Sequence, residues 1–289
     1  MDTKLTGKTR IESDLIGARE IPAEALYGVQ TLRGIENFSI SKFRLSEYPL
    51  FIKGLAITKM AAAMANFELG LLTVEQKDAI IAACGEILDG KHHDQFPVDM
   101  IQGGAGTTTN MNANEVIANR ALELMGYERG EYQYCSPNDH VNCSQSTNDA
   151  YPTAIHIGMY FKHLQLLPHL EELIASFRKK GEEFSQIIKM GRTQLEDAVP
   201  MTLGQTFNGF ASILQDEIAH LNEAAADFLV VNMGATAIGT GICAEPGYAE
   251  KCIAALREIT GWDIRLSSDL VGATSDTSCL VGYASAMKR

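Results

Sequence analysis

Residues 145–152, with the sequence QSTNDAYP, carry the side chains of this chain that are best suited to bind a ligand. An amphipathic stretch follows, so Ser146, Thr147 and Asn148 are predicted in the first turn of a helix. Backbone N–H groups lack partners there and the helix dipole is positive, which favours an anion. Ser146 and Asp149 also have the spacing of a capping box, so Ser146 could serve only as a helix cap.

Two further segments with hydroxyl groups precede helical patterns. Residues 106–110 (GTTTN) contain Thr107, and residues 191–194 (GRTQ) contain Thr193 and Gln194. Three such segments together favour a carboxylate-binding site in which hydroxyl and amide groups are the donors. Taken singly, each residue also fits a purely structural role in a turn, a loop or a first helical turn.

The composition predicts a globular protein and argues against some classes of partner. The chain has 289 residues, of which 46% are hydrophobic, enough for a sizeable core in one or two domains. Its net charge is −12 and no run of basic residues occurs, which argues against nucleic acid as a partner. Because this charge repels anions, an anionic substrate must be held by local donors.

Neither a metal site nor a membrane anchor is expected. The six cysteines lack CxxC or zinc-ligand spacing, so reduced thiols are predicted. His92 and His93 are adjacent without a third ligand at suitable spacing, which favours a solvated loop. His156 and His163 lie on a helical stretch and are predicted to be packed or surface side chains. No apolar leader or long uncharged span occurs, so a cytoplasmic protein is expected.

Hydrophobic periodicity predicts a mostly α-helical fold. Residues 1–50 look irregular, with short extended pieces. Helices are predicted over residues 48–69, 73–90, 112–125, 151–188 and 201–231. Residues 1–145 are expected to form a small mixed helical domain, and residues 146–289 the first long helices of a bundle.

Three details complete the predicted bundle domain. Pro168 is expected to kink the first long helix, and Pro200 to start the second. The glycine-rich connector 234–241 lacks the ending of a phosphate loop and is predicted to be a turn. Residues 276–289 look like another helix that has just begun.

Several motifs in order resemble the aspartase/fumarase superfamily of lyases, most closely its aspartate ammonia-lyase branch. The matching segments are 102–107 (QGGAGT), 110–112 (NMN), 136–142 (SPNDHVN), 145–152, 191–195 (GRTQL) and 234–241. Fumarases carry His where Gln194 stands, and so do some aspartases, so Gln194 supports the aspartase branch without being required for it. Ser136 replaces the His of a secondary anion site in fumarases, which puts that site in doubt here.

The resemblance implies a reaction and a set of site residues. Aspartases eliminate ammonia from L-aspartate to give fumarate, through an aci-carboxylate with a second negative charge, by general base catalysis and without a cofactor. By resemblance, Thr107, Ser146 and Thr147 hold the β-carboxylate, and Asn148, Thr193 and Gln194 surround the amino group. Fixed donors are an efficient way to stabilise the charge that develops.

One family feature is missing from these residues. The signature loop that supplies the serine base in relatives does not occur in the sequence, so we expect the catalytic serine beyond Arg289 and no lyase activity from the present residues alone. Intact relatives are homotetramers that build each site from three subunits. Two alternatives stay open: a class II fumarase acting on fumarate and malate, and a non-catalytic scaffold such as the lens crystallins built on this fold.

Overall fold

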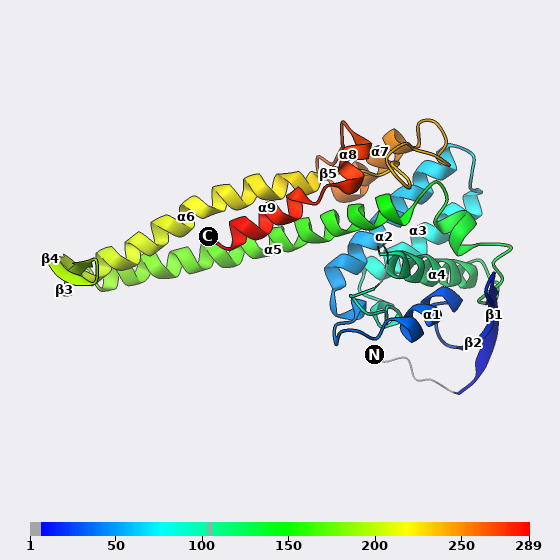
Figure 1. Ribbon diagram of the computed structural model, residues 1–289, viewed down its shortest axis with the longest axis horizontal. Coiled ribbons are helices and arrows are strands. Elements are labelled where there is room, and N and C mark those ends of the chain that lie inside the picture. Colours follow the sequence, from blue (N-terminus) through cyan, green and yellow to red (C-terminus); the bar gives the residue numbers. More distant parts are fainter. Residues whose placement is uncertain (1–6, 103, 105) are drawn as a thin grey trace. The chain divides into compact units, whose positions relative to one another are not determined.

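The computed structural model describes residues 7–102, 104 and 106–289, and these are mostly helical, as predicted (Figure 1). The chain divides into two compact units. One consists of Met1–Met159 with Leu229–Asp276, and the other of Tyr160–Phe228 with Thr277–Arg289. The domain boundary expected at residue 146 stays a prediction, since compact units and domains need not coincide.

The first unit combines small strand pairs with a helical core. Strands β1 (Thr9–Asp14) and β2 (Gly17–Pro22) form an antiparallel hairpin, and β5 (Val230–Val231) pairs in parallel with β6 (Arg265–Leu266). The α-helices are α1 (Val29–Asn37), α2 (Pro49–Glu68), α3 (Val74–Leu88), α4 (Thr107–Leu124), the beginning of α5 (Thr147–Glu183), α7 (Tyr248–Thr260) and α8 (Leu270–Ser275). Short helical turns lie at η1 (Leu45–Glu47), η2 (His93–Gln95) and η3 (Pro137–Val141).

Helix α2 forms the centre of this core and packs against α3, α4 and α7. By length and composition it could cross a membrane, but most of it is buried inside the unit, so it is a core helix. Glycines let it approach α5 closely: a methyl group at Gly54 would overlap the Ala154 carbonyl oxygen, and one at Gly158 would lie 3.1 Å from Phe51 Cα. Gly54 meets Ala154, and the earlier Phe51 meets the later Gly158, so α2 and α5 run antiparallel where they cross. Lys59, farther along α2, therefore lies next to the start of α5.

The second unit is a bundle of the rest of α5, α6 (Leu203–Ala226) and α9 (Ser278–Met287) (Figure 1). An antiparallel hairpin of β3 (Ile188–Thr193) and β4 (Glu196–Thr202) joins α5 to α6, and η4 (Asp227–Leu229) follows α6. Phe177 packs against Phe207 and Phe210, so aromatic rings fill the seam between α5 and α6.

Most predicted helices are confirmed, and three expectations are wrong. Thr73 caps α3 with a capping box, and α9 lies where a final helix was expected. Helix α4 begins at Thr107 instead of residue 112, because Gly106 caps it in a left-handed conformation. Residues 29–37, in the stretch expected to be irregular, form helix α1. Helix α5 is continuous across Pro168, and the kink expected there stays a prediction. Pro200 lies in β4, and it is Thr202 that caps α6.

The β3–β4 turn breaks a local rule. Gln194 (φ 52°) and Leu195 (φ 69°) both adopt left-handed backbone angles in a two-residue turn, a conformation that favours glycine or asparagine. Leu195 is also 95% exposed. The turn therefore combines backbone strain with an exposed apolar side chain.

We expect Leu195→Gly to raise the free energy of unfolding by up to about 1 kcal/mol, because glycine removes the steric cost of the left-handed backbone. Urea denaturation measures this change. Leu195→Ala is the matched control, since it removes the exposed side chain but keeps Cβ. An equal gain in the free energy of unfolding in both variants would show that the exposed side chain, and not backbone strain, destabilises the turn.

Candidate active site

Two of the three predicted segments meet where α4 and α5 begin. Gly106, the N-cap of α4, lies against the ring of Tyr151 in α5, where a methyl group on the glycine would overlap the ring. Asn110 in α4 donates from Nδ2 to Oγ1 of Thr147 at 3.2 Å. The exposed Thr107 and the half-buried Ser146, Thr147 and Asn148 thus all belong to the N-terminal turns of two adjoining helices. Two positive helix ends converge there, which suits an anion.

Ser146 is the helix cap that its spacing predicts. Its Oγ accepts the Asn148 backbone N–H at 3.1 Å, and its own N–H donates to Asp149 Oδ1 at 2.9 Å. Capping uses only the hydroxyl oxygen, and a hydroxyl also has one proton to donate. Capping the helix and binding an anion are therefore compatible roles for Ser146.

Hydrogen bonds join the glycine-rich connector 234–241 to the first turn of α5. Asp149 is fully buried and accepts the backbone N–H groups of Gly234 (3.1 Å) and Thr236 (2.9 Å). Asn148 Nδ2 donates to the Ala237 carbonyl at 2.8 Å, which directs its Oδ1 away from the connector. Burial raises the pKa of Asp149, while these backbone donors oppose the rise. The predicted turn thus also orients an amide that is a candidate ligand for an amino group.

Lys59 lies beneath the two helix starts, fully buried. Its Nζ donates to Asn110 Oδ1 (2.7 Å), Gln145 Oε1 (2.8 Å) and Asn142 Oδ1 (3.0 Å). Burial lowers the pKa of Lys59 to about 7, although the negative charge of nearby Asp149 acts in the opposite direction. Within this polar cluster Lys59 and Asn110 are buried, and Asn142 and Gln145 are half-buried.

Thr193 and Gln194 belong to the other unit. Thr193 ends β3 and Gln194 is the first residue of the strained turn, both with exposed side chains. The structure therefore gathers Thr107, Ser146, Thr147 and Asn148 within one unit, and places the remaining two candidates on a hairpin of the second.

Sequence reasoning missed the buried support of this site. Lys59, Asn110 and Asn142 were not predicted to take part, although a lysine within the apolar and alanine-rich stretch 49–68 is a usable signal. Lysine is almost never fully buried without partners, so its partners must be polar groups from other elements. Only the fold identifies which groups they are.

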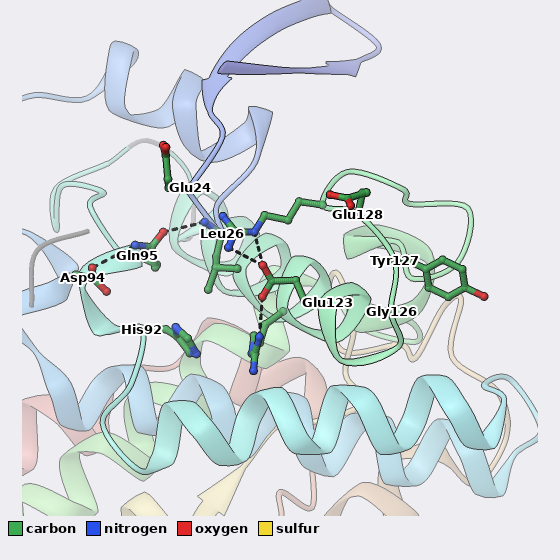
Figure 2. A pocket seen from close by; sticks show the side chains of 11 residues that line it. Glu24, Leu26, His92, Asp94, Gln95, Glu123, Gly126, Tyr127 and Glu128 are labelled. Carbon is green, nitrogen blue, oxygen red and sulfur yellow. Dashed lines mark hydrogen bonds and ion pairs between the residues drawn. The ribbon is translucent and has the colours of Figure 1, made fainter. Parts of the chain in front are cut away.

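A cavity lies elsewhere in the first unit. It has a volume of about 670 Å³, and Figure 2 shows the residues that line it. Glu123 lies between two guanidinium groups, accepting from Arg120 Nη1 at 2.7 Å and Arg129 Nε at 2.6 Å. His92 Nε2 is 2.8 Å from Glu86 Oε2. Because these charged groups bond one another, we interpret the cavity as structural.

His163 is packed, as predicted, whereas His93, expected in a solvated loop, is half-buried in η2. His163 is buried, between the Tyr283 hydroxyl (3.1 Å) and Asn222 Oδ1 (3.0 Å). His93 Nε2 lies 2.9 Å from the Ile87 carbonyl. Within residues 7–102, 104 and 106–289, no group of three or more His, Cys, Asp or Glu side chains could hold a metal ion.

Comparison with known proteins identifies the family. A family model described as a lyase matches residues 17–289. The chain belongs to this lyase family. It is 54% identical over 281 residues to an aspartate ammonia-lyase of Pseudomonas canavaninivorans, which covers 97% of this chain and 59% of that protein. The aspartate ammonia-lyase of Escherichia coli K12 is 51% identical over 286 residues, covering 99% and 60%.

Solved structures of lyases share the fold. A fumarate lyase:delta crystallin from Brucella melitensis bound to cobalt matches 98% of this chain and 61% of its own, with a TM-score of 0.96 and 50% identity. A class II fumarase from Schistosoma mansoni matches 96% and 62%, with a TM-score of 0.90 and 32% identity. The predicted family and fold class are thus confirmed. The chain spans about 60% of the length of the curated relatives it matches.

We expect Gly106→Ala to destabilise the first unit by about 2 kcal/mol or more. The new Cβ would overlap the Tyr151 ring, and the backbone angle (φ 86°) disfavours any L side chain. Gly126→Ala is the matched control, with φ 85° but open space around the new methyl group. Urea denaturation should show a clearly smaller loss for the control. Equal losses of unfolding free energy in the two variants would mean that overlap with Tyr151 does not add to the destabilisation.

The buried lysine should make stability depend on pH. Between pH 7 and its ordinary pKa of 10.5, the folded protein holds fewer protons at Lys59 than the unfolded chain does. The contribution of Lys59 to the free energy of unfolding therefore rises with pH in this window, by at most about 1.4 kcal/mol per unit. In urea denaturation, the free energy of unfolding of the unsubstituted protein minus that of Lys59→Met should therefore rise from pH 7 to 9. The same difference for Lys53→Met, a partly exposed lysine on the same helix, should stay constant.

Proposed function

We propose that the complete protein is an aspartate ammonia-lyase, which reversibly eliminates ammonia from L-aspartate to give fumarate. The observation that carries this proposal is the meeting of the α4 and α5 N-termini at Thr107, Ser146 and Thr147. Curated relatives with 51–54% identity that bear this name support it.

In this proposal, Thr107, Ser146 and Thr147 bind the β-carboxylate of aspartate. Removing the proton from the adjacent carbon leaves a second negative charge on that carboxylate, and fixed hydroxyl donors stabilise it. Each donor of this kind contributes roughly 3–4 kcal/mol in comparable oxyanion sites. The effect is catalytic because the second charge exists only along the reaction path.

Asn148, Thr193 and Gln194 would surround the amino group. The bond from Asn148 Nδ2 to the Ala237 carbonyl leaves Asn148 Oδ1 as the acceptor for an ammonium group. Neutral acceptors suit a group that must leave as ammonia. The base, by family resemblance a serine, is expected outside these 289 residues, and no organic cofactor is needed for this chemistry.

We further propose a cytoplasmic homotetramer. Thr193 and Gln194 lie in a different unit from the remaining candidates, which fits a site assembled from several subunits. Apolar side chains exposed on the second unit fit burial against other copies; they include Leu173 (45%), Phe210 (46%), Ile213 (61%) and Val281 (62%).

The reaction is tested with the complete gene product by following fumarate absorbance with L-aspartate and with L-malate. Production of fumarate from aspartate at rates at least a hundredfold above those from malate is the expected result. The reverse preference would support the class II fumarase alternative. Loss of both activities in a folded, complete protein would support a non-catalytic scaffold.

We expect Thr147→Val and Ser146→Ala each to lower kcat/KM for aspartate by roughly a hundredfold or more, mainly through kcat. The missing donor affects the charged intermediate more than bound aspartate. Thr153→Val is the matched control: it makes the same change farther along α5, at a buried hydroxyl without a hydrogen-bond partner in the described chain. We call the proposed carboxylate site of Thr107, Ser146 and Thr147 the cradle. If both variants kept near-normal kcat and only bound aspartate more weakly, the cradle would be wrong and Ser146 would be a helix cap and nothing more.

Gln194→Ala should behave differently, raising KM more than it lowers kcat. The proposed partner of Gln194 is the amino group, which is already present in bound aspartate, so the lost contact weakens ground state and transition state alike. Steady-state kinetics with aspartate separate the two effects. A selective fall in kcat would instead place Gln194 in the chemical step.

A further inference from the structure

The ammonium group of Lys59 fixes the orientation of every amide that it contacts. An ammonium group can donate hydrogen bonds but cannot accept them. Asn110, Asn142 and Gln145 must therefore each present an oxygen to Nζ, at 2.7, 3.0 and 2.8 Å. The two ends of an amide side chain are easily interchanged, but this donor permits one orientation only.

That orientation determines which hydrogen bond Asn110 makes at the cradle. With Oδ1 on Lys59, the Nδ2 of Asn110 faces Thr147 Oγ1 at 3.2 Å and Asn142 Oδ1 at 3.0 Å. An amide NH2 group only donates, so the Thr147 oxygen accepts here. The single hydroxyl proton of Thr147 is therefore not used by Asn110.

We propose that Lys59 is a positioning residue that sets the hydrogen-bond polarity of the cradle, acting through Asn110 so that Thr147 donates its proton to the bound carboxylate. This inference rests on the proposed function, in which Thr147 binds that carboxylate. If Asn110 were reversed, its oxygen would attract the Thr147 proton and remove one donor from the site.

Surrounding bonds hold the same arrangement in place. Asn142 Oδ1 also accepts from Asn114 Nδ2 at 3.2 Å, so only donors surround this oxygen. Gln145 donates from Nε2 to the carbonyls of Val141 (2.9 Å) and Cys143 (3.1 Å), which fixes the backbone just before Ser146. One buried ammonium thus orders both the partner of Thr147 and the segment that leads into the helix cap.

The decisive variant is Asn110→Asp, with Asn142→Asp as its matched control. Both place a carboxylate against Lys59, and so add the same charge at the same group. A carboxylate at position 110 cannot donate to Thr147 and instead accepts the threonine proton. A carboxylate at position 142 still accepts from Asn110, so the orientation of Asn110 is kept.

Fumarate is the probe, and its dissociation constant is measured by isothermal titration calorimetry with the complete protein at pH 6. We expect Asn110→Asp to weaken binding about tenfold or more relative to Asn142→Asp, the scale of one hydrogen bond to a charged group. Adding Thr147→Val to Asn110→Asp should weaken fumarate binding little further, because each change takes the Thr147 hydroxyl proton away from the bound carboxylate.

The outcomes separate the two proposals. If Thr147→Val leaves fumarate binding unchanged, or fumarate does not bind, the proposed cradle is wrong. If Thr147→Val weakens binding but Asn110→Asp matches Asn142→Asp, the cradle stands and the role of Lys59 is overturned.

A second measurement does not depend on any variant folding. In the unsubstituted protein at pH 6, nuclear Overhauser effects from the Asn110 side-chain NH2 protons to the Thr147 side chain are expected. Effects from these protons to the Lys59 Hε protons, without any to Thr147, would show the reversed amide and overturn the inference.

Discussion

The burial of the Lys59 ammonium is the constraint around which the polar groups of the first unit are arranged. A buried cation requires acceptors on every side, because leaving it unpaired costs several kcal/mol. Those acceptors come from α4 and from the segment before α5, with the Asp149 carboxylate close enough to act on the same charge. Elements distant in the sequence are thereby fixed around one point, directly beneath the hydroxyl groups proposed to bind substrate.

Glycines make this enclosure geometrically possible. Gly54 and Gly158 let α2 and α5 approach until backbone touches backbone, and Gly106 lets the start of α4 lie against Tyr151. A Cβ at Gly54 or Gly106 would overlap its neighbour, and one at Gly158 would crowd the backbone of Phe51. The close approach of these elements therefore depends on glycine at the three positions.

The second unit has a different character. Its helices make a narrow aromatic seam, while large apolar side chains such as Ile213 and Leu195 remain exposed. The turn at Gln194 and Leu195 combines left-handed backbone angles with a Leu195 side chain that is 95% exposed. Backbone strain and exposed apolar surface of this kind are typical of segments that bind a partner, which agrees with the proposed tetramer.

The sequence by itself determined the helical fold, the family and the cap at Ser146, because these depend on local periodicity, motif order and spacing. It also indicated Thr107 and Thr147, since hydroxyls at helix starts have a recognisable pattern. Only the tertiary structure decided that Lys59 supports them, because its partners lie 51 to 86 positions away along the chain. The β3–β4 hairpin was missed because its turn uses residues that disfavour left-handed angles. Local sequence rules therefore gave no sign of this turn.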